Sequence, residues 1–146
     1  MSLTRFLTDD RPLIKMSGTD TVMAAVEQMT ESDRSSVLIL NDAGFLEGIF
    51  TERDLMTRVV KPGLNPATTT LDAVMTKNVI VLSRNTNLDH AIGIMSKNHV
   101  RHLPVEDQNN QIVGVISLRH LLHDKINHVV QELKVLEEFD GNVPGG

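Results

Sequence analysis

A chain of 146 residues with 40% hydrophobic and 23% charged side chains has the size and composition of one soluble globular domain. It contains no cysteine, which excludes disulfides, thiol catalysis and zinc–thiolate sites. Its net charge is −5 with scattered basic residues, and its only aromatic residues are four Phe, so a nucleic-acid partner is not expected. No apolar run approaches the ~20 residues that span a bilayer. We therefore expect a cytoplasmic protein with no membrane segment.

The first half of the chain predicts a β-α-β-β-α unit. Short apolar runs indicate strands, apolar residues at helical spacing after a polar cap indicate the first helix, and Thr51 stands where the N-cap of a second helix belongs. In chain order, the elements are expected at 13–16, 22–29, 37–40, 45–50 and from Thr51 onward.

The second half of the chain repeats this pattern at a constant spacing of 66 residues. Apolar character is kept around identical pairs, which include Ser17 and Ser83, Ala25 and Ala91, Met29 and Met95, Gly48 and Gly114, Arg53 and Arg119, Leu55 and Leu121. The second set of elements is expected at 79–82, 88–95, 103–105, 112–116 and from Ser117 onward. Self-similarity at a fixed period indicates a repeated unit. Two copies are too few for a solenoid, so a closed pseudo-symmetric pair with a mixed α+β fold is predicted.

Two prolines at 61–66 predict a linker, and residues 71–75 predict a short helical turn that leads into the second copy. The resulting organisation is repeat 1 with an N-terminal segment at 1–60, a linker at 61–76, repeat 2 at 77–124, and a C-terminal helix extension and tail at 125–146.

The last helix is expected to extend beyond its counterpart in the first copy. From Leu118 to Phe139 it would run ~33 Å at 1.5 Å per residue, and Gly141 and Pro144 would end it. Its apolar residues follow a heptad-like spacing of 4, 3, 4, 3, namely Leu122, Ile126, Val129, Leu133 and Leu136. The stripe either packs on its own domain or contacts another subunit; its length favours the second interpretation, a homodimer.

The residues Gly48, Thr51 and Asp54 form the pattern Gly-x-x-Thr-x-x-Asp where a strand meets a helix. Glycine allows a ligand to approach the strand closely, and residues three apart are neighbours on the first helical turn. A carboxylate there can accept from the two adjacent hydroxyls of a ribose, and a helix N-terminus favours phosphate. Helix capping by Thr51 and Asp54 explains the same residues, and from this pattern alone it is the preferred interpretation.

Taken together, the doubled unit and its motifs resemble a tandem pair of CBS domains, also called a Bateman module. The resemblance covers nearly the whole chain. The segments that carry it are the Gly-x-x-Thr-x-x-Asp pattern, residues 50–55, residues 72–76 and residues 99–105 (His-Val-Arg-His-Leu-Pro-Val).

The resemblance implies a regulatory module that senses an adenosine-containing ligand in clefts between the copies. The implied ligands are AMP, ADP or ATP and, in some members, NAD(H) or S-adenosylmethionine. Thr51 and Asp54 would bind the ribose beside Gly48. The adenine would lie against Val79, Ile80, Leu103 and Pro104, and the phosphate near Lys77, Arg101 and His102. Arg53 would either reach the phosphate or stay an ordinary surface arginine.

The mirror-image cleft departs from the family pattern. Ser117 is kept, but His120 replaces the ribose-binding aspartate, and a neutral imidazole offers only one acceptor. The second cleft is therefore expected to bind weakly or not at all. A different interpretation treats His120, His123, Asp124 and His128 as metal ligands, but no established ligand spacing such as His-Glu-x-x-His supports it.

No nucleophile with a base and no paired carboxylates support catalysis, so the protein is not expected to be an enzyme. The leading hypothesis is a regulatory nucleotide-binding module that acts in trans on an unknown protein. The alternative is an oligomerisation or interaction protein with a vestigial nucleotide cleft.

Overall fold

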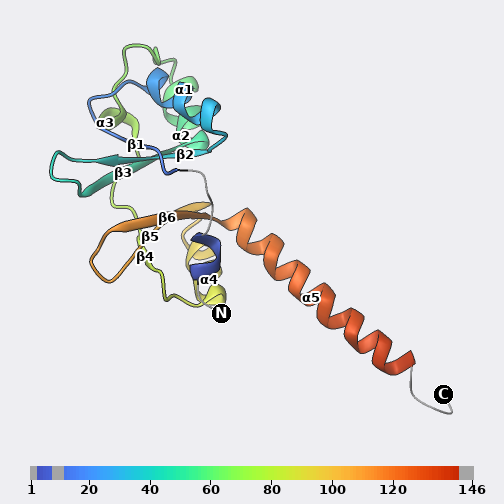
Figure 1. Cartoon of the computed structure of the whole chain (residues 1–146). Helices are drawn as coiled ribbons and strands as arrows, with labels where there is room; N and C mark the ends of the chain where they lie inside the picture. Colours follow the sequence, from blue (N-terminus) through green and yellow to red (C-terminus); the bar gives the residue numbers. More distant parts are fainter. Residues whose placement is uncertain (1–2, 8–11, 142–146) are drawn as a thin grey trace.

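The computed structural model describes residues 3–7 and 12–141. Two three-stranded sheets, each with its own helices, lie one above the other in Figure 1. The first copy consists of β1 (Lys15–Met16), α1 (Val22–Ser32), β2 (Ser36–Leu40), β3 (Leu46–Thr51), α2 (Glu52–Asp54) and the π-helical segment η2 (Leu55–Val60). The second consists of β4 (Leu82–Ser83), α4 (Leu88–Lys97), β5 (His102–Glu106), β6 (Ile112–Ser117) and α5 (Leu118–Gly141). Two short helices, η1 (Leu3–Leu7) and α3 (Leu71–Val74), precede the copies.

The two sheets have the same topology and register, which confirms the predicted repeat. In each, the first strand pairs in parallel with the second, and the second pairs antiparallel with the third. Val37 lies opposite Phe50 as Leu103 lies opposite Ile116, and each sheet has a register irregularity at the end of its middle strand. The mixed α+β fold with two β-α-β-β-α units is therefore confirmed.

Helix caps explain where the first helices begin. The hydroxyl of Thr21 accepts from the backbone N–H of Ala24, and the side chain of Asn87 accepts from that of Asp89. Each helix then buries the side chains that point at its own sheet.

Three predicted elements differ from the structure, namely the first strand of each copy and the second helix of the first copy. The first strands are shorter and begin later than expected, because ladder pairing with the neighbouring strand is limited to Lys15–Met16 in the first copy and Leu82–Ser83 in the second. In the first copy, the predicted second helix changes to π-helical hydrogen bonding after Asp54, and Lys61 N–H bonds to the carbonyl of Met56, five residues back.

Each copy has a separate core, and each core takes in the helical turn that precedes the other copy. Leu71 and Val74 of α3, which leads into the second copy, belong to the buried cluster of the first copy. Leu3 and Phe6 of η1, which leads into the first copy, belong to the cluster of the second. The copies therefore exchange their leading turns.

Two glycines mark the places where these turns cross the strands. A Cβ on Gly48 would lie 2.7 Å from the sulfur of Met75, directly after α3, and one on Gly114 would lie 2.5 Å from Cδ2 of Leu7 in η1. The corresponding residues of the two turns are 68 rather than 66 positions apart. The turns therefore do not appear in the repeat at the constant spacing of 66 residues.

Helix α5 leaves the second sheet and extends away from both copies (Figure 1). Leu121 is fully buried near its start, whereas the predicted heptad-like stripe is exposed from Leu122 onward. Within residues 3–7 and 12–141, the stripe therefore does not pack on its own domain. It leaves a long apolar face open.

Candidate ligand-binding site

A hollow of about 370 Å³ opens between the copies at the start of α2, within the range that small-molecule ligands occupy. Thr51, Asp54 and Arg58 line it from the first copy, and Thr76 lines it from the linker. The second copy contributes the segment 99–102, directly before and at the start of β5. We call this the Asp54 hollow.

Asp54 is only 6% exposed, and hydrogen bonds to both carboxylate oxygens hold it in place. Oδ2 accepts from the backbone N–H of Thr51 (3.0 Å) and from its hydroxyl (3.2 Å), while Oδ1 accepts from the hydroxyl of Thr76 (2.9 Å). The hydroxyl of Thr51 also accepts from the backbone N–H of Asp54, which completes a capping box. The helix-capping interpretation is confirmed, so any ribose recognition has to use the same carboxylate.

Arginine side chains surround this carboxylate. Nε of Arg58 lies 3.6 Å from Oδ1 of Asp54, and Nη1 donates to the carbonyl of Met75. Arg53 and Arg101 also line the hollow, are exposed, and have no ion pair among the described residues. With Glu52 on the same wall, the hollow has three arginines against two carboxylates. Its rim therefore favours a ligand with negative charge.

The imidazole of His102 is shared between the copies. Its Nε2 lies 2.8 Å from the hydroxyl of Ser35, which belongs to the other copy. Burial lowers the pKa of His102 below its ordinary value of 6.5; the charge of Glu52 opposes this shift and that of Arg101 adds to it. The ring is therefore neutral at pH 7, and the positive charge at this wall comes from arginine.

The structure brings only some of the expected site residues together. Five of them line the Asp54 hollow: Thr51, Arg53, Asp54, Arg101 and His102. Six others lie outside it: Gly48, Lys77, Val79, Ile80, Leu103 and Pro104.

The six outlying residues have other surroundings. Gly48 allows the linker to approach β3, since Ile49 and Thr76 exchange backbone hydrogen bonds of 3.0 and 2.9 Å next to it. Leu103 and Pro104 are buried within β5, Val79 is half-buried, and Lys77 and Ile80 are exposed. A direct role for them in adenine or phosphate binding stays a prediction.

Sequence reasoning missed two residues that touch Asp54. Arg58 follows Asp54 at a spacing of four, which places the two side chains on one helix face and was a usable signal. Thr76 ends the motif at 72–76, but nothing in the sequence shows that its hydroxyl reaches back 22 residues to a carboxylate.

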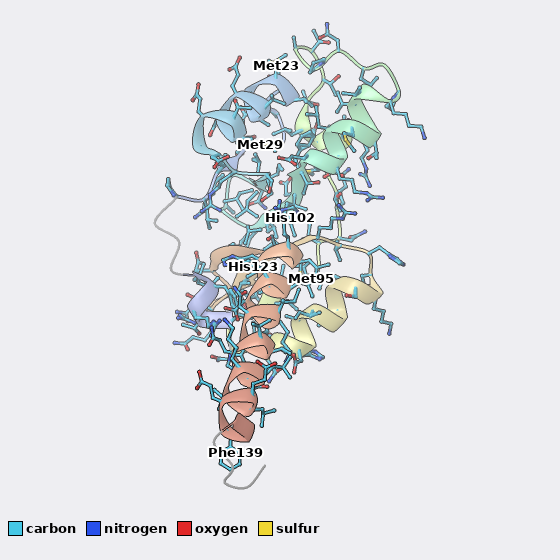
Figure 2. All side chains as sticks on the ribbon, turned by 90° about the vertical axis from the view of Figure 1, so that its right-hand side faces the viewer. Met23, Met29, Met95, His102, His123 and Phe139 are labelled. Carbon is cyan, nitrogen blue, oxygen red and sulfur yellow. The ribbon has the colours of Figure 1, made fainter. Side chains whose placement is uncertain are left out.

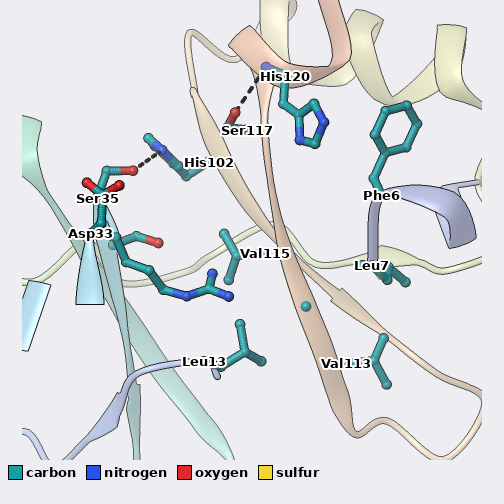
Figure 3. A pocket seen from close by; sticks show the side chains of 13 residues that line it. Phe6, Leu7, Leu13, Asp33, Ser35, His102, Val113, Val115, Ser117 and His120 are labelled. Atoms are coloured by element: carbon teal, nitrogen blue, oxygen red, sulfur yellow. Dashed lines mark hydrogen bonds between the residues drawn. The ribbon is translucent and has the colours of Figure 1, made fainter. Parts of the chain in front are cut away.

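The mirror-image hollow around Ser117 and His120 is smaller, at about 160 Å³ (Figure 3). Phe6 and Leu7 of η1 lie on one side of it, and the ring of Phe6 meets that of His120 edge-on with centroids 5.3 Å apart. The hydroxyl of Ser117 accepts from the backbone N–H of His120, so the helix cap is kept although the carboxylate is lost. The two hollows differ in volume and in chemistry, and the expected weak binding in the smaller one stays a prediction.

Two further findings concern the described part of the chain. It contains no group of three or more His, Asp or Glu side chains arranged to hold a metal ion. Among residues 3–7 and 12–141, no helix combines the length and the apolar character needed to cross a membrane.

Comparison with known proteins identifies the family. The family model described as "CBS domain" matches twice, at residues 8–61 and 71–126. The chain therefore belongs to the CBS-domain family and contains a tandem pair of these domains.

Individual relatives agree with this assignment. The chain is 37% identical over 123 residues to the CBS domain-containing protein CBSCBSPB1 of Arabidopsis thaliana, covering 84% of this chain but only 22% of that protein. The structure also resembles the CBS-domain containing protein ATU1752 from Agrobacterium tumefaciens, with a TM-score of 0.77, 26% identity, and coverage of 86% of this chain and 99% of the other.

A second similar structure contains a nucleotide. The CBS domain protein PAE2072 from Pyrobaculum aerophilum was solved in complex with AMP. Its TM-score is 0.72 over 82% of this chain and 88% of the other, but its identity is 19%, so this likeness concerns the fold alone.

Proposed function

We propose that the protein is a regulatory module that binds an adenosine nucleotide in the Asp54 hollow. The observation that carries this proposal is a buried carboxylate, Asp54, on the wall of a ligand-sized hollow with uncompensated arginines at its rim. A ribose diol fits the carboxylate, and a phosphate fits the arginines. The AMP-bound relative of the same fold supports a nucleotide of this class.

The hydrogen bonds of Asp54 leave a route for ribose binding. A carboxylate has about four lone-pair positions, and three are taken here, two of them by the hydroxyls of Thr51 and Thr76. A hydroxyl rotates freely, so a ligand diol can replace these two donors while the N–H of Thr51 stays bound. The helix cap would therefore persist in the complex.

Arg53 and Arg101 are the side chains best placed to hold the phosphate. They come from different copies, line the same hollow and have no described ion pair. A phosphate between them would join the two copies electrostatically. Ligand binding can change the arrangement of the copies, or of a dimer, only through unequal affinity for the alternatives.

Isothermal titration calorimetry tests this function with AMP, ATP, NADH and S-adenosylmethionine on the wild type and on Asp54→Asn, Arg53→Gln and Arg101→Gln. We expect one site per chain for a phosphate-bearing ligand, weakened about tenfold or more in each variant because a charge-assisted hydrogen bond contributes ~1.5–3 kcal/mol. Lys61→Gln, which removes an exposed cation outside the hollow, is the matched control. No heat with any of the four ligands would overturn the proposal. Two equal sites per chain would overturn only the asymmetry.

An interaction protein with a vestigial cleft is the second candidate. One observation favours it: α5 exposes an apolar face that the described part of the chain does not cover. The chain spans only about a fifth of the Arabidopsis relative, so the regulated partner, and any activity attached to it, stays open. Failure of every ligand together with a stable α5-dependent assembly would favour this candidate.

A further inference from the structure

Helix α5 has an apolar face that no described residue of the same chain covers. Figure 2 shows His123 near the body of the protein and Phe139 at the far end of the helix. The stripe along this helix is 40% to 60% exposed and consists of Leu122, Ile126, Val129, Leu133 and Leu136. A stripe with this heptad-like spacing is typical of a helix that packs against another helix.

Charge changes sign along α5. Its first half is basic apart from Asp124, with Arg119 and Lys125 beside three histidines. Its second half is acidic apart from Lys134, with Glu132, Glu137 and Glu138. Two such helices side by side attract each other when antiparallel, and they bring like charges together when parallel.

A groove of about 770 Å³ runs beside the start of α5 and continues its apolar face. Three apolar residues line it, namely Leu118, Leu122 and Ile126. Arg101 and Arg119 supply its positive charge next to a single carboxylate, Glu52. Both arginines are exposed and have no ion pair within the described residues. The groove therefore combines the apolar and the basic surface that the second half of α5 would complement.

We propose that this groove receives the second half of α5 from a second copy of the chain, so that two α5 helices pack antiparallel. With Leu122 of one copy beside Leu133 of the other, Glu137 of the second copy lies level with Leu118 of the first. The N–H of Leu118 donates to the carbonyl of Arg101 (2.8 Å), so this register brings Glu137 and Glu138 to the arginines of the groove. Both ends of the helix pair are equivalent, and the contact closes as a two-fold dimer.

Analytical ultracentrifugation tests whether α5 makes the dimer. Leu133→Asp and Leu136→Asp should raise the dimer dissociation constant at least about tenfold, because each buries a charge in the helix seam. Phe45→Asp is the matched control, since Phe45 is 64% exposed in the β2–β3 turn and lies outside the seam. Two results would overturn the proposal. One is a wild type that stays monomeric at 100 times the protein concentration used for the variants, and the other is a dimer that both seam variants leave intact.

Charge reversal tests the groove. The double variants Glu137→Lys/Glu138→Lys and Arg101→Glu/Arg119→Glu should each weaken self-association about tenfold or more, and an equimolar mixture should form a heterodimer. Glu31→Lys/Asp42→Lys changes net charge by the same amount as the glutamate reversal, on exposed positions of the first copy, and should leave the dimer intact. A mixture that fails to associate would exclude the groove contact.

Orientation is tested by crosslinking, because the chain contains no native cysteine. Leu122→Cys and Leu133→Cys, one of them carrying a mass tag, should form a mixed disulfide when combined and little disulfide alone. Efficient self-crosslinking of both variants would show a parallel pair and would contradict the proposal. None of these three tests needs a nucleotide. The seam variants and the cysteine variants lie outside the Asp54 hollow, so their outcome is independent of ligand binding there, whereas Arg101 lines both the hollow and the groove.

Discussion

The hydroxyl of Ser35 and Nε2 of His102 lie 2.8 Å apart and connect the two copies across the hollow shown in Figure 3. Ser35 directly precedes β2, and His102 begins β5, so the bond joins equivalent ends of the two sheets. His102 lines both the Asp54 hollow and the smaller one. A change in the charge of His102 therefore alters the contact between the copies.

Protonation of His102 is expected to destabilise the protein. Its pKa in the folded state is lowered by burial, so below pH 6.5 the unfolded chain binds the proton first. The stabilising contribution is complete above pH 6.5, falls as the pH drops, and is lost once the lowered folded pKa is passed. Urea unfolding between pH 5 and pH 8 should show a steeper loss for the wild type than for His102→Gln, whose side chain does not titrate.

His90→Gln serves as the control for this measurement, because His90 is exposed on α4. It should leave the pH dependence of the wild type unchanged. Identical pH profiles for the wild type and His102→Gln would contradict the assignment.

Replacing Asp54 should destabilise the protein even without ligand. Both carboxylate oxygens of the buried Asp54 accept hydrogen bonds from Thr51 or Thr76. Asp54→Asn replaces one of these acceptors by an NH₂ group, which can only donate. The expected loss is about 1–3 kcal/mol of unfolding free energy. Asp42→Asn, in the exposed β2–β3 turn, should have almost no effect. Equal urea midpoints for the two variants would mean that the capping box contributes nothing.

The two matched glycines should respond differently to alanine. At Gly48 the new methyl group would meet the carbonyl oxygen of Thr76 at 2.7 Å as well as Met75, and a backbone atom cannot move aside cheaply. At Gly114 it would meet only the end of the Leu7 side chain within 3 Å. Differential scanning calorimetry should therefore give a larger drop in Tm for Gly48→Ala than for Gly114→Ala. The reverse order would contradict the packing.

Shortening a buried side chain in an exchanged turn should destabilise mainly the copy whose core contains that turn. Leu3→Ala removes a fully buried side chain from the second core, and Leu71→Ala removes one from the first. Each should cost about 2–5 kcal/mol. Hydrogen exchange should rise in α4 and β5 for Leu3→Ala but in α1 and β2 for Leu71→Ala. Equal protection loss in both copies for either variant would argue against separate cores.

Much of the fold could be predicted from the sequence because its strand and helix patterns recur at a constant spacing. Two sets of strand and helix patterns at one spacing predicted the paired units, and Thr51 and Ser117 correctly marked the helix starts. The exchange of leading turns escaped detection because its two-residue shift leaves Leu3 and Leu71 outside the common register.

The candidate site was less accessible to prediction, because it depends on contacts between distant segments. The Thr51 and Asp54 pair could be read from a spacing of three, but the bond from Thr76 depends on the linker crossing β3. For Leu103, the resemblance implies a position at the ligand, and the strand directs its side chain into the core of the second copy, so its role in binding stays a prediction.

The exchange of η1 and α3 means that neither half of the chain holds a complete core of its own. A fragment starting after η1 would leave a vacancy in the distant second copy, and a fragment ending before α3 would leave one in the first. A single ancestral unit with this architecture would have needed the leading turn of a second molecule to complete its core. Fusing two such units in one gene would turn this contact between two molecules into a contact within one chain.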